Sequence, residues 1–77
     1  MDIKTIAAMG LGLTPAELRL AKALVDGQEL NEFATSHSLS IFTVRNQLKA
    51  VFSKTGVSRQ VDLVLLLIRD THGEHTR

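Results

Sequence analysis

The sequence predicts a small all-α domain in which four helices follow a short N-terminal arm. Two observations support this fold class. Apolar residues recur at helical spacing along most of the 77 residues, and residues typical of helix caps separate the apolar stretches. The composition agrees, with one proline and with three aromatic residues that are all phenylalanine. A chain this short buries only about 60% of the surface that it exposes when unfolded. We therefore expect an unusually apolar core or a partner subunit.

The chain divides into three expected parts. Residues 1–12 form an N-terminal arm or linker, and Gly10 and Gly12 mark a flexible joint at its end. The pattern of this arm is compatible with a short helix as well as with an irregular segment. Residues 13–70 form the domain, and residues 71–77 form a polar tail that we expect to be disordered.

Composition also excludes several classes of protein. No cysteine is present, which excludes disulfides and thiolate metal sites. The first eleven residues carry two charges and lack a long apolar run, so we expect no signal peptide. The longest uncharged apolar run, Leu63 to Ile68, is too short to cross a bilayer. We expect a cytoplasmic protein that does not enter a membrane.

Catalysis and metal binding are not expected. No nucleophile–base pair and no glycine-rich phosphate loop are visible, so we predict neither an enzyme nor a cofactor. His72, Glu74 and His75 are metal-ligand types at short spacing. They lie on the polar tail without a third anchored donor, so we predict no metal site there.

The clearest helix start lies at residues 14–17. Thr14 is the expected N-cap, Pro15 occupies the first helical position, and Glu17 completes a capping box. Gly27 is expected to end this helix, because a left-handed residue is favoured after a helix C-terminus. A shorter helix follows, with Leu30, Phe33 and Ala34 on one face.

A turn at residues 36–39 separates this short helix from a longer one at about 41–55, which Ser40 caps. Two such helices joined by a three- or four-residue turn form a helix-turn-helix. The longer helix has one apolar face, formed by Ile41, Val44, Leu48, Val51 and Phe52.

The other face of helix 41–55 carries Arg45, Asn46 and Lys49. Donors of these types match guanine and adenine edges in the major groove. No acidic residue occurs between Glu32 and Asp62, although this window holds four cations: Arg45, Lys49, Lys54 and Arg59. We interpret the helix as a DNA-recognition helix; the simpler alternative is a solvated amphipathic helix without a ligand.

The last predicted helix, Arg59 to about Arg69, is apolar on two sides. Val61, Val64, Leu65 and Ile68 form one face, and Leu63, Leu66 and Leu67 lie almost opposite. A helix that packs only within its own domain needs one apolar stripe. We therefore predict that Leu63, Leu66 and Leu67 contact a second subunit. In the alternative, residues 1–11 fold back and cover a face of this helix.

Several ordered motifs resemble the LuxR-type (GerE-type) helix-turn-helix domain of bacterial transcriptional regulators. They are LTPAE at 13–17, Gly27, residues 32–34, Leu39-Ser40, TVRNQLKAVFSKTGV at 43–57 and the segment 59–63. The resemblance covers residues 13 to about 69. It implies a three-helix core with a C-terminal dimerisation helix, and sequence-specific binding of double-stranded DNA as a homodimer.

The resemblance also implies residue roles. Base-reading positions fall on Arg45, Asn46 and Lys49, and backbone-contacting positions fall on Thr43 and Lys54. We include Ser40 and Arg59 in the expected backbone-contacting set, and RNA polymerase or a larger regulator as an expected further partner. A different function is also open, in which the chain is a small interaction module that heterodimerises with a larger LuxR-type regulator.

The chain departs from the family pattern at three places. Arg19 stands where a second glutamate is usual. Ser38 replaces the usual turn glycine and His37 a usual leucine, so we expect a looser or differently shaped turn. Ile41 and Phe42 are apolar near the expected DNA surface, where they would contact a thymine methyl group or pack on the N-terminal arm.

Overall fold

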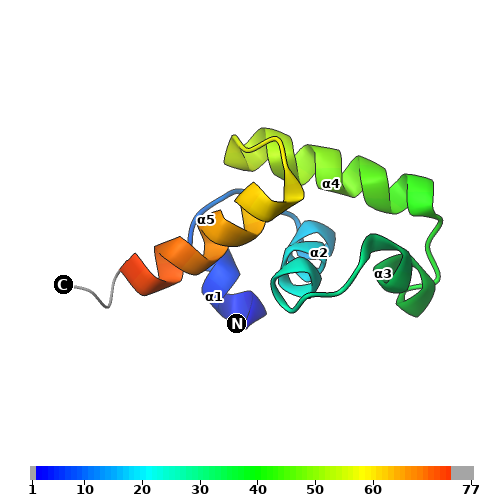
Figure 1. The fold of residues 1–77 in the computed structure, drawn as a ribbon, viewed down its shortest axis with the longest axis horizontal. Helices are drawn as coiled ribbons and strands as arrows, with labels where there is room; N and C mark the ends of the chain where they lie inside the picture. The colour runs from blue at the N-terminus through cyan, green and yellow to red at the C-terminus, as the bar shows by residue number, and fades with distance from the viewer. Residues whose placement is uncertain (1, 74–77) are drawn as a thin grey trace.

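The computed structural model describes the backbone of residues 2–73 and the side chains of residues 2–69. All of the regular secondary structure in this part of the chain is helical, as predicted, and no strand occurs in it (Figure 1). Its helices are α1 (Ile3–Ala7), α2 (Pro15–Val25), α3 (Leu30–Ser36), α4 (Ile41–Thr55) and α5 (Gln60–Gly73). None of the described helices is long and apolar enough to cross a membrane.

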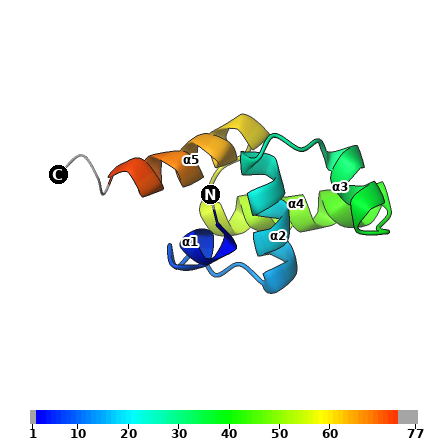
Figure 2. The same cartoon turned by 90° about the horizontal axis from the view of Figure 1, so that it is seen from below.

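Helix α2 is the centre of the fold, because α1, α3, α4 and α5 all pack against it. Helix α4 crosses α2, and its N-terminal end packs against α3 (Figure 2). The core is apolar, and its largest side chains without exposed surface are Ile6, Leu20, Val44, Val51, Leu63 and Leu67. The long helix α4 is therefore supported by two other helices rather than projecting alone.

The start of α2 has the predicted capping box. The Thr14 hydroxyl accepts a hydrogen bond from the Glu17 backbone N–H at 3.2 Å, and Glu17 Oε1 accepts from the Thr14 N–H at 2.9 Å. Ser40 caps α4 as predicted, since its hydroxyl accepts from the Thr43 N–H at 3.1 Å. Gly56 closes α4 with a φ of 79°, a conformation that a side chain disfavours.

The turn between α3 and α4 is better closed than the sequence predicts. Ser38 adopts a left-handed φ of 55°, the conformation that a glycine normally supplies here. Its N–H donates to the Thr35 carbonyl, and the Leu39 N–H donates to the Ala34 carbonyl at 2.8 Å. These two bonds make a Schellman motif. The expectation of a looser turn is therefore wrong, because serine takes the conformation that this motif requires.

The N-terminal segment forms a helix, which decides one alternative left by the sequence. Helix α1 packs against α2, and the side chain of Ile6 has no exposed surface. Met9 and Leu11 are partly buried against the same core. Residues 3–11 thus contribute to the same core as the later helices.

Helix α5 differs from its prediction in two ways. It begins at Gln60 and extends to Gly73, into the expected polar tail, while residues 74–77 lie outside the described structure. Leu63 and Leu67 face inward, with no exposed surface, whereas Val61 and Leu65 are each 57% exposed. This corrects the predicted dimerisation surface. Leu63 and Leu67 pack in the core that α5 shares with α2, so they offer no surface to a second subunit. Leu66 is partly buried.

Candidate nucleic-acid interface

The outer face of α4 gathers the three residues predicted to read bases. Arg45, Asn46 and Lys49 are all exposed. At about 100° per residue they fall within an arc of about 100° around the helix axis. The buried residues Val44 and Val51 lie on the opposite side of the helix. The structure therefore brings the three donors onto one surface and leaves them accessible.

Phe42 lies about one helical turn before Arg45 on this side of α4 and is 73% exposed. The sequence left open whether Phe42 packs on the N-terminal arm, but α1 packs against α2 and leaves Phe42 uncovered. Its neighbour Ile41 is instead partly buried against the core. An exposed apolar ring beside three hydrogen-bond donors is suited to contact with a thymine methyl group.

Ser40 and Thr43 lie at the N-terminal end of the same helix, and both are exposed. Their hydroxyl oxygens are 3.1 Å apart, so the two side chains are hydrogen-bonded to each other. Ser40 also caps the helix, which fixes its rotamer. Both hydroxyls retain the capacity for one more hydrogen bond, and their predicted contact with DNA backbone stays a prediction.

Lys54 has a partner that the sequence did not reveal. Its Nζ lies 2.7 Å from Oε1 of Glu17, a side chain that is only 9% exposed. The Lys54 ammonium and then the Thr14 backbone N–H hold the pKa of the Glu17 carboxyl below its ordinary value of 4.5. The two residues are 37 positions apart, so no local pattern could indicate the pair. The charge that we assigned to phosphate is therefore neutralised within the domain.

Arg59 is also paired. Its guanidinium donates to both carboxylate oxygens of Asp62, at 2.9 and 3.4 Å, although the arginine side chain remains 73% exposed. Such an exposed pair contributes little to stability, about 0–1 kcal/mol. Among the four cations of the basic window, Arg45 and Lys49 are the two without an ion pair in the described part of the chain.

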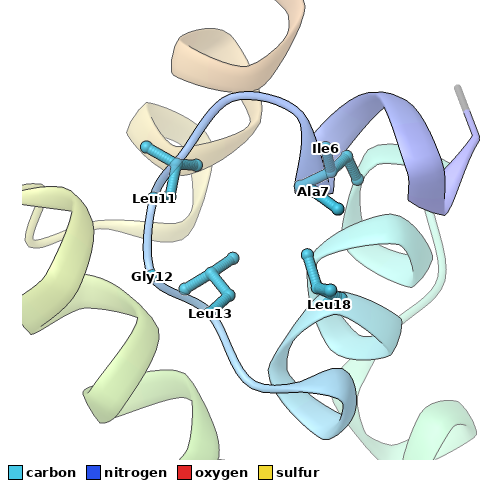
Figure 3. A pocket seen from close by; sticks show the side chains of 6 residues that line it. All are labelled: Ile6, Ala7, Leu11, Gly12, Leu13 and Leu18. Atoms are coloured by element: carbon cyan, nitrogen blue, oxygen red, sulfur yellow. The ribbon is translucent and has the colours of Figure 1, made fainter.

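Two of the hollows on the described surface lie away from α4. One, of about 170 Å³, lies between α1, the loop at residues 11–13 and α2, and is lined by Ile6, Ala7, Leu11, Gly12, Leu13 and Leu18 (Figure 3). The other, of about 260 Å³, is lined by residues of α1, α2 and α3 and by Asp26, Gln28 and His37. The first offers only apolar side chains, so it holds no group that could act as an acid, a base or a nucleophile.

Metal-ligand residues do not converge in the described residues, where no group of three histidine, aspartate or glutamate side chains could hold an ion. The side chains of His72, Glu74 and His75 lie outside the described residues. His37 is exposed at the turn, where its ring stacks on Phe33 with the ring centres 4.1 Å apart. Its Nδ1 lies 3.0 Å from the Phe33 carbonyl oxygen, so this nitrogen carries the proton in the neutral ring.

Comparisons with family models, with curated proteins and with solved structures give no significant match. The packing of α3 and α4 and the exposed residues on the outer face of α4 are therefore the observations that bear on the function of the chain.

Proposed function

We propose that this chain is a bacterial transcriptional regulator of the LuxR-type class, which binds double-stranded DNA sequence-specifically. The observation that carries the proposal is the outer face of α4, where Arg45, Asn46 and Lys49 are exposed together. Arginine and lysine pair with guanine edges and asparagine with adenine edges, so this set suits a mixed base sequence. The buried opposite face of α4 supports the proposal, because a recognition helix must be held firmly to present its side chains to the groove.

The proposed complex places α4 in the major groove. Phe42 then lies against the bases, while Ser40 and Thr43, at the start of α4, lie near the phosphates. Arg59 reaches the backbone only if it exchanges its bond with Asp62 for a phosphate contact, which its exposure permits. Lys54 is not assigned to a phosphate, since it already neutralises Glu17.

Dimerisation is part of the proposal, through α5. Val61 and Leu65 are each 57% exposed and lie one helical turn apart, so they form an apolar strip along the outside of α5. Two copies joined through these strips would present their recognition helices about one turn of DNA apart, roughly 34 Å. This surface replaces the predicted one at Leu63 and Leu67, and it corresponds to the other apolar face of the helix.

Selection of bound sequences from a random DNA pool tests the proposal. A palindromic consensus with half-sites about one helical turn apart is the expected result. Failure of the folded protein to enrich any sequence would refute sequence-specific binding.

A matched pair of variants then tests the assigned residues. Arg45→Ala is expected to weaken binding to the selected site by about 1–3 kcal/mol and to relax the base preference nearby. Arg19→Ala, an exposed arginine on α2, removes the same charge away from α4 and serves as the control. Equal losses on selected and random DNA for Arg45→Ala would remove its base-reading role.

One observation favours the second function, an interaction module that heterodimerises with a larger regulator. Lys54 and Arg59 are paired internally, which leaves Arg45 and Lys49 to attract DNA from the basic window. With few free cations the DNA affinity of the chain alone should be low. In that case the selection gives no consensus, while the strip of Val61 and Leu65 still supports association with a larger homologue.

A further inference from the structure

The strongest polar link between the recognition helix and the rest of the domain is the ion pair of Lys54 with Glu17. Glu17 is the buried charged residue of the described core, with 7% of its surface exposed. Its Oε1 accepts two hydrogen bonds, one from the Thr14 backbone N–H at 2.9 Å and one from Lys54 Nζ at 2.7 Å. One carboxylate oxygen therefore joins the first turn of α2 to the last turn of α4.

The hydrogen bond between Lys54 and Glu17 depends on direction, whereas the apolar packing that makes up the rest of the α2–α4 contact does not. The other buried residues of the two helices are apolar, among them Leu20, Leu24, Val44 and Val51. Apolar burial depends on area and tolerates small rotations of a helix. A 2.7 Å charge-assisted hydrogen bond does not, because it weakens steeply when its distance or angle changes. A buried carboxylate without its partner is also strongly disfavoured, so the bond is maintained.

The position of Lys54 on α4 makes the bond sensitive to rotation. At about 100° per residue, Lys54 lies about 140° around the helix from Lys49. Gln47 lies on the same flank as Lys54, but its Oε1 is buried without a hydrogen-bond partner, so it adds no second polar anchor through that atom. Any rotation of α4 that moves Lys54 away from Glu17 turns Arg45 and Lys49 by the same angle.

We propose that Glu17 and Lys54 are positioning residues for DNA recognition: their bond sets the rotation of α4 about its axis and so aims Arg45, Asn46 and Lys49 at the base edges. Neither residue touches a base in this arrangement. The proposal rests on the proposed function, and it assigns to Lys54 a role different from a direct phosphate contact.

The two roles of Lys54 predict different salt dependence. If Lys54 binds a phosphate, Lys54→Met lowers the slope of log affinity against log salt by about 1, on selected and random DNA alike. If Lys54 positions α4, the same substitution weakens binding to the selected site by roughly 5- to 150-fold, the value of one base contact, and leaves the slope and the affinity for random DNA unchanged. Glu17→Gln supplies the decisive comparison, because glutamine still accepts the Thr14 N–H but carries no charge.

The experiment uses the full chain and four variants: Glu17→Gln, Lys54→Met, the double variant and Lys54→Arg. If the pair positions α4, Glu17→Gln and Lys54→Met lower the affinity for the selected site by a similar factor. The double variant then loses no more affinity than the single variant with the larger loss. Lys54→Arg retains affinity, since arginine keeps the charge and the donors. If Lys54→Met unfolds, Glu17→Gln and the double variant, which leave no buried unpaired charge, decide the question.

A second measurement does not depend on DNA. Residual dipolar couplings of the backbone amides report the orientation of α4 relative to α2 in each folded variant. The proposal predicts a rotation of α4 in Glu17→Gln and Lys54→Met but not in Lys54→Arg. A wild-type protein that selects no DNA sequence would refute the proposed function, while these couplings would still test the positioning role. Unchanged orientation and unchanged specific affinity in Glu17→Gln would overturn the positioning role, as would a slope change confined to Lys54→Met and the double variant.

Discussion

Two leucines of α5, two positions apart, are expected to respond very differently to the same substitution. Leu63 has no exposed surface, while Leu65 is 57% exposed. A domain of this size has a free energy of unfolding of about 4–12 kcal/mol, from roughly 0.05–0.15 kcal/mol per residue. Leu63→Ala removes buried methyl groups and leaves a cavity, so it should lower the free energy of unfolding by about 2–5 kcal/mol. This loss is a large part of the total.

Leu65→Ala provides the matched control. Less than half of the Leu65 surface is buried, and full burial of a leucine contributes only about 1.5–3 kcal/mol. Alanine also keeps part of the buried area, so the expected loss for the isolated subunit is below about 1 kcal/mol. Urea denaturation followed by circular dichroism measures both variants, and a constant dependence on denaturant shows that the unfolded state is unchanged.

The dependence of stability on protein concentration shows whether Leu65 is buried within one subunit or between two subunits. If Leu65 is buried between two subunits, Leu65→Ala destabilises the protein more at high concentration than at low concentration, because association stabilises the folded state by mass action. Leu63→Ala should show the same loss at both concentrations. Equal losses for the two variants at low concentration, or a larger loss for Leu65→Ala, would refute the assignment of the inner and outer faces of α5.

Four further outcomes are expected. Leu65→Glu should remain folded but sediment as a monomer under conditions in which the wild type is a dimer; a monomeric wild type would contradict this interface. Ser40→Ala should cost about 1 kcal/mol in thermal unfolding through loss of the α4 cap, whereas Ser53→Ala, exposed within the helix, should cost nothing. Gly56→Ala should cost about 1 kcal/mol, because its φ of 79° disfavours a side chain; an unchanged melting temperature would exclude this conformation. Since the folded-state pKa of Glu17 lies below its ordinary 4.5, the pair stabilises the protein at neutral pH and the benefit is lost as pH falls below about 4.5. Stability should therefore fall less steeply with acid in Glu17→Gln than in the wild type.

The helices could be predicted because their signals are local. Thr14, Pro15 and Glu17 indicate the start of α2 within four residues, and Ser40 and Gly56 bound α4 in the same way. The outer face of α4 followed from periodicity alone, since its buried and exposed residues alternate with the helical repeat. The start of α3 was missed as a cap, because the N-cap is Glu29 rather than a serine or threonine and its backbone N–H donates to Oε1 of Glu32 at 2.9 Å.

The tertiary packing and the long-range ion pair could not be predicted. Both faces of α5 are apolar, so periodicity gave no reason to place Leu63 inside and Leu65 outside; the packing of α5 on α2 decides it. The pairing of Lys54 with Glu17 joins distant parts of the chain. It was not predicted, because the sequence already suggested a local role for each of the two residues. Glu17 was accounted for as a capping residue, and Lys54 as a cation in a basic window.

The left-handed conformation of Ser38, between α3 and α4, lowers the stability that this protein could reach. A side chain in that conformation costs roughly 1–2 kcal/mol relative to glycine, and Ser38 bears this cost while its N–H makes one of the two hydrogen bonds of the motif. The junction between α3 and α4 is therefore a place where removing one small side chain would raise the melting temperature without altering the angle between the helices. Directed evolution for heat resistance should return glycine at position 38 early.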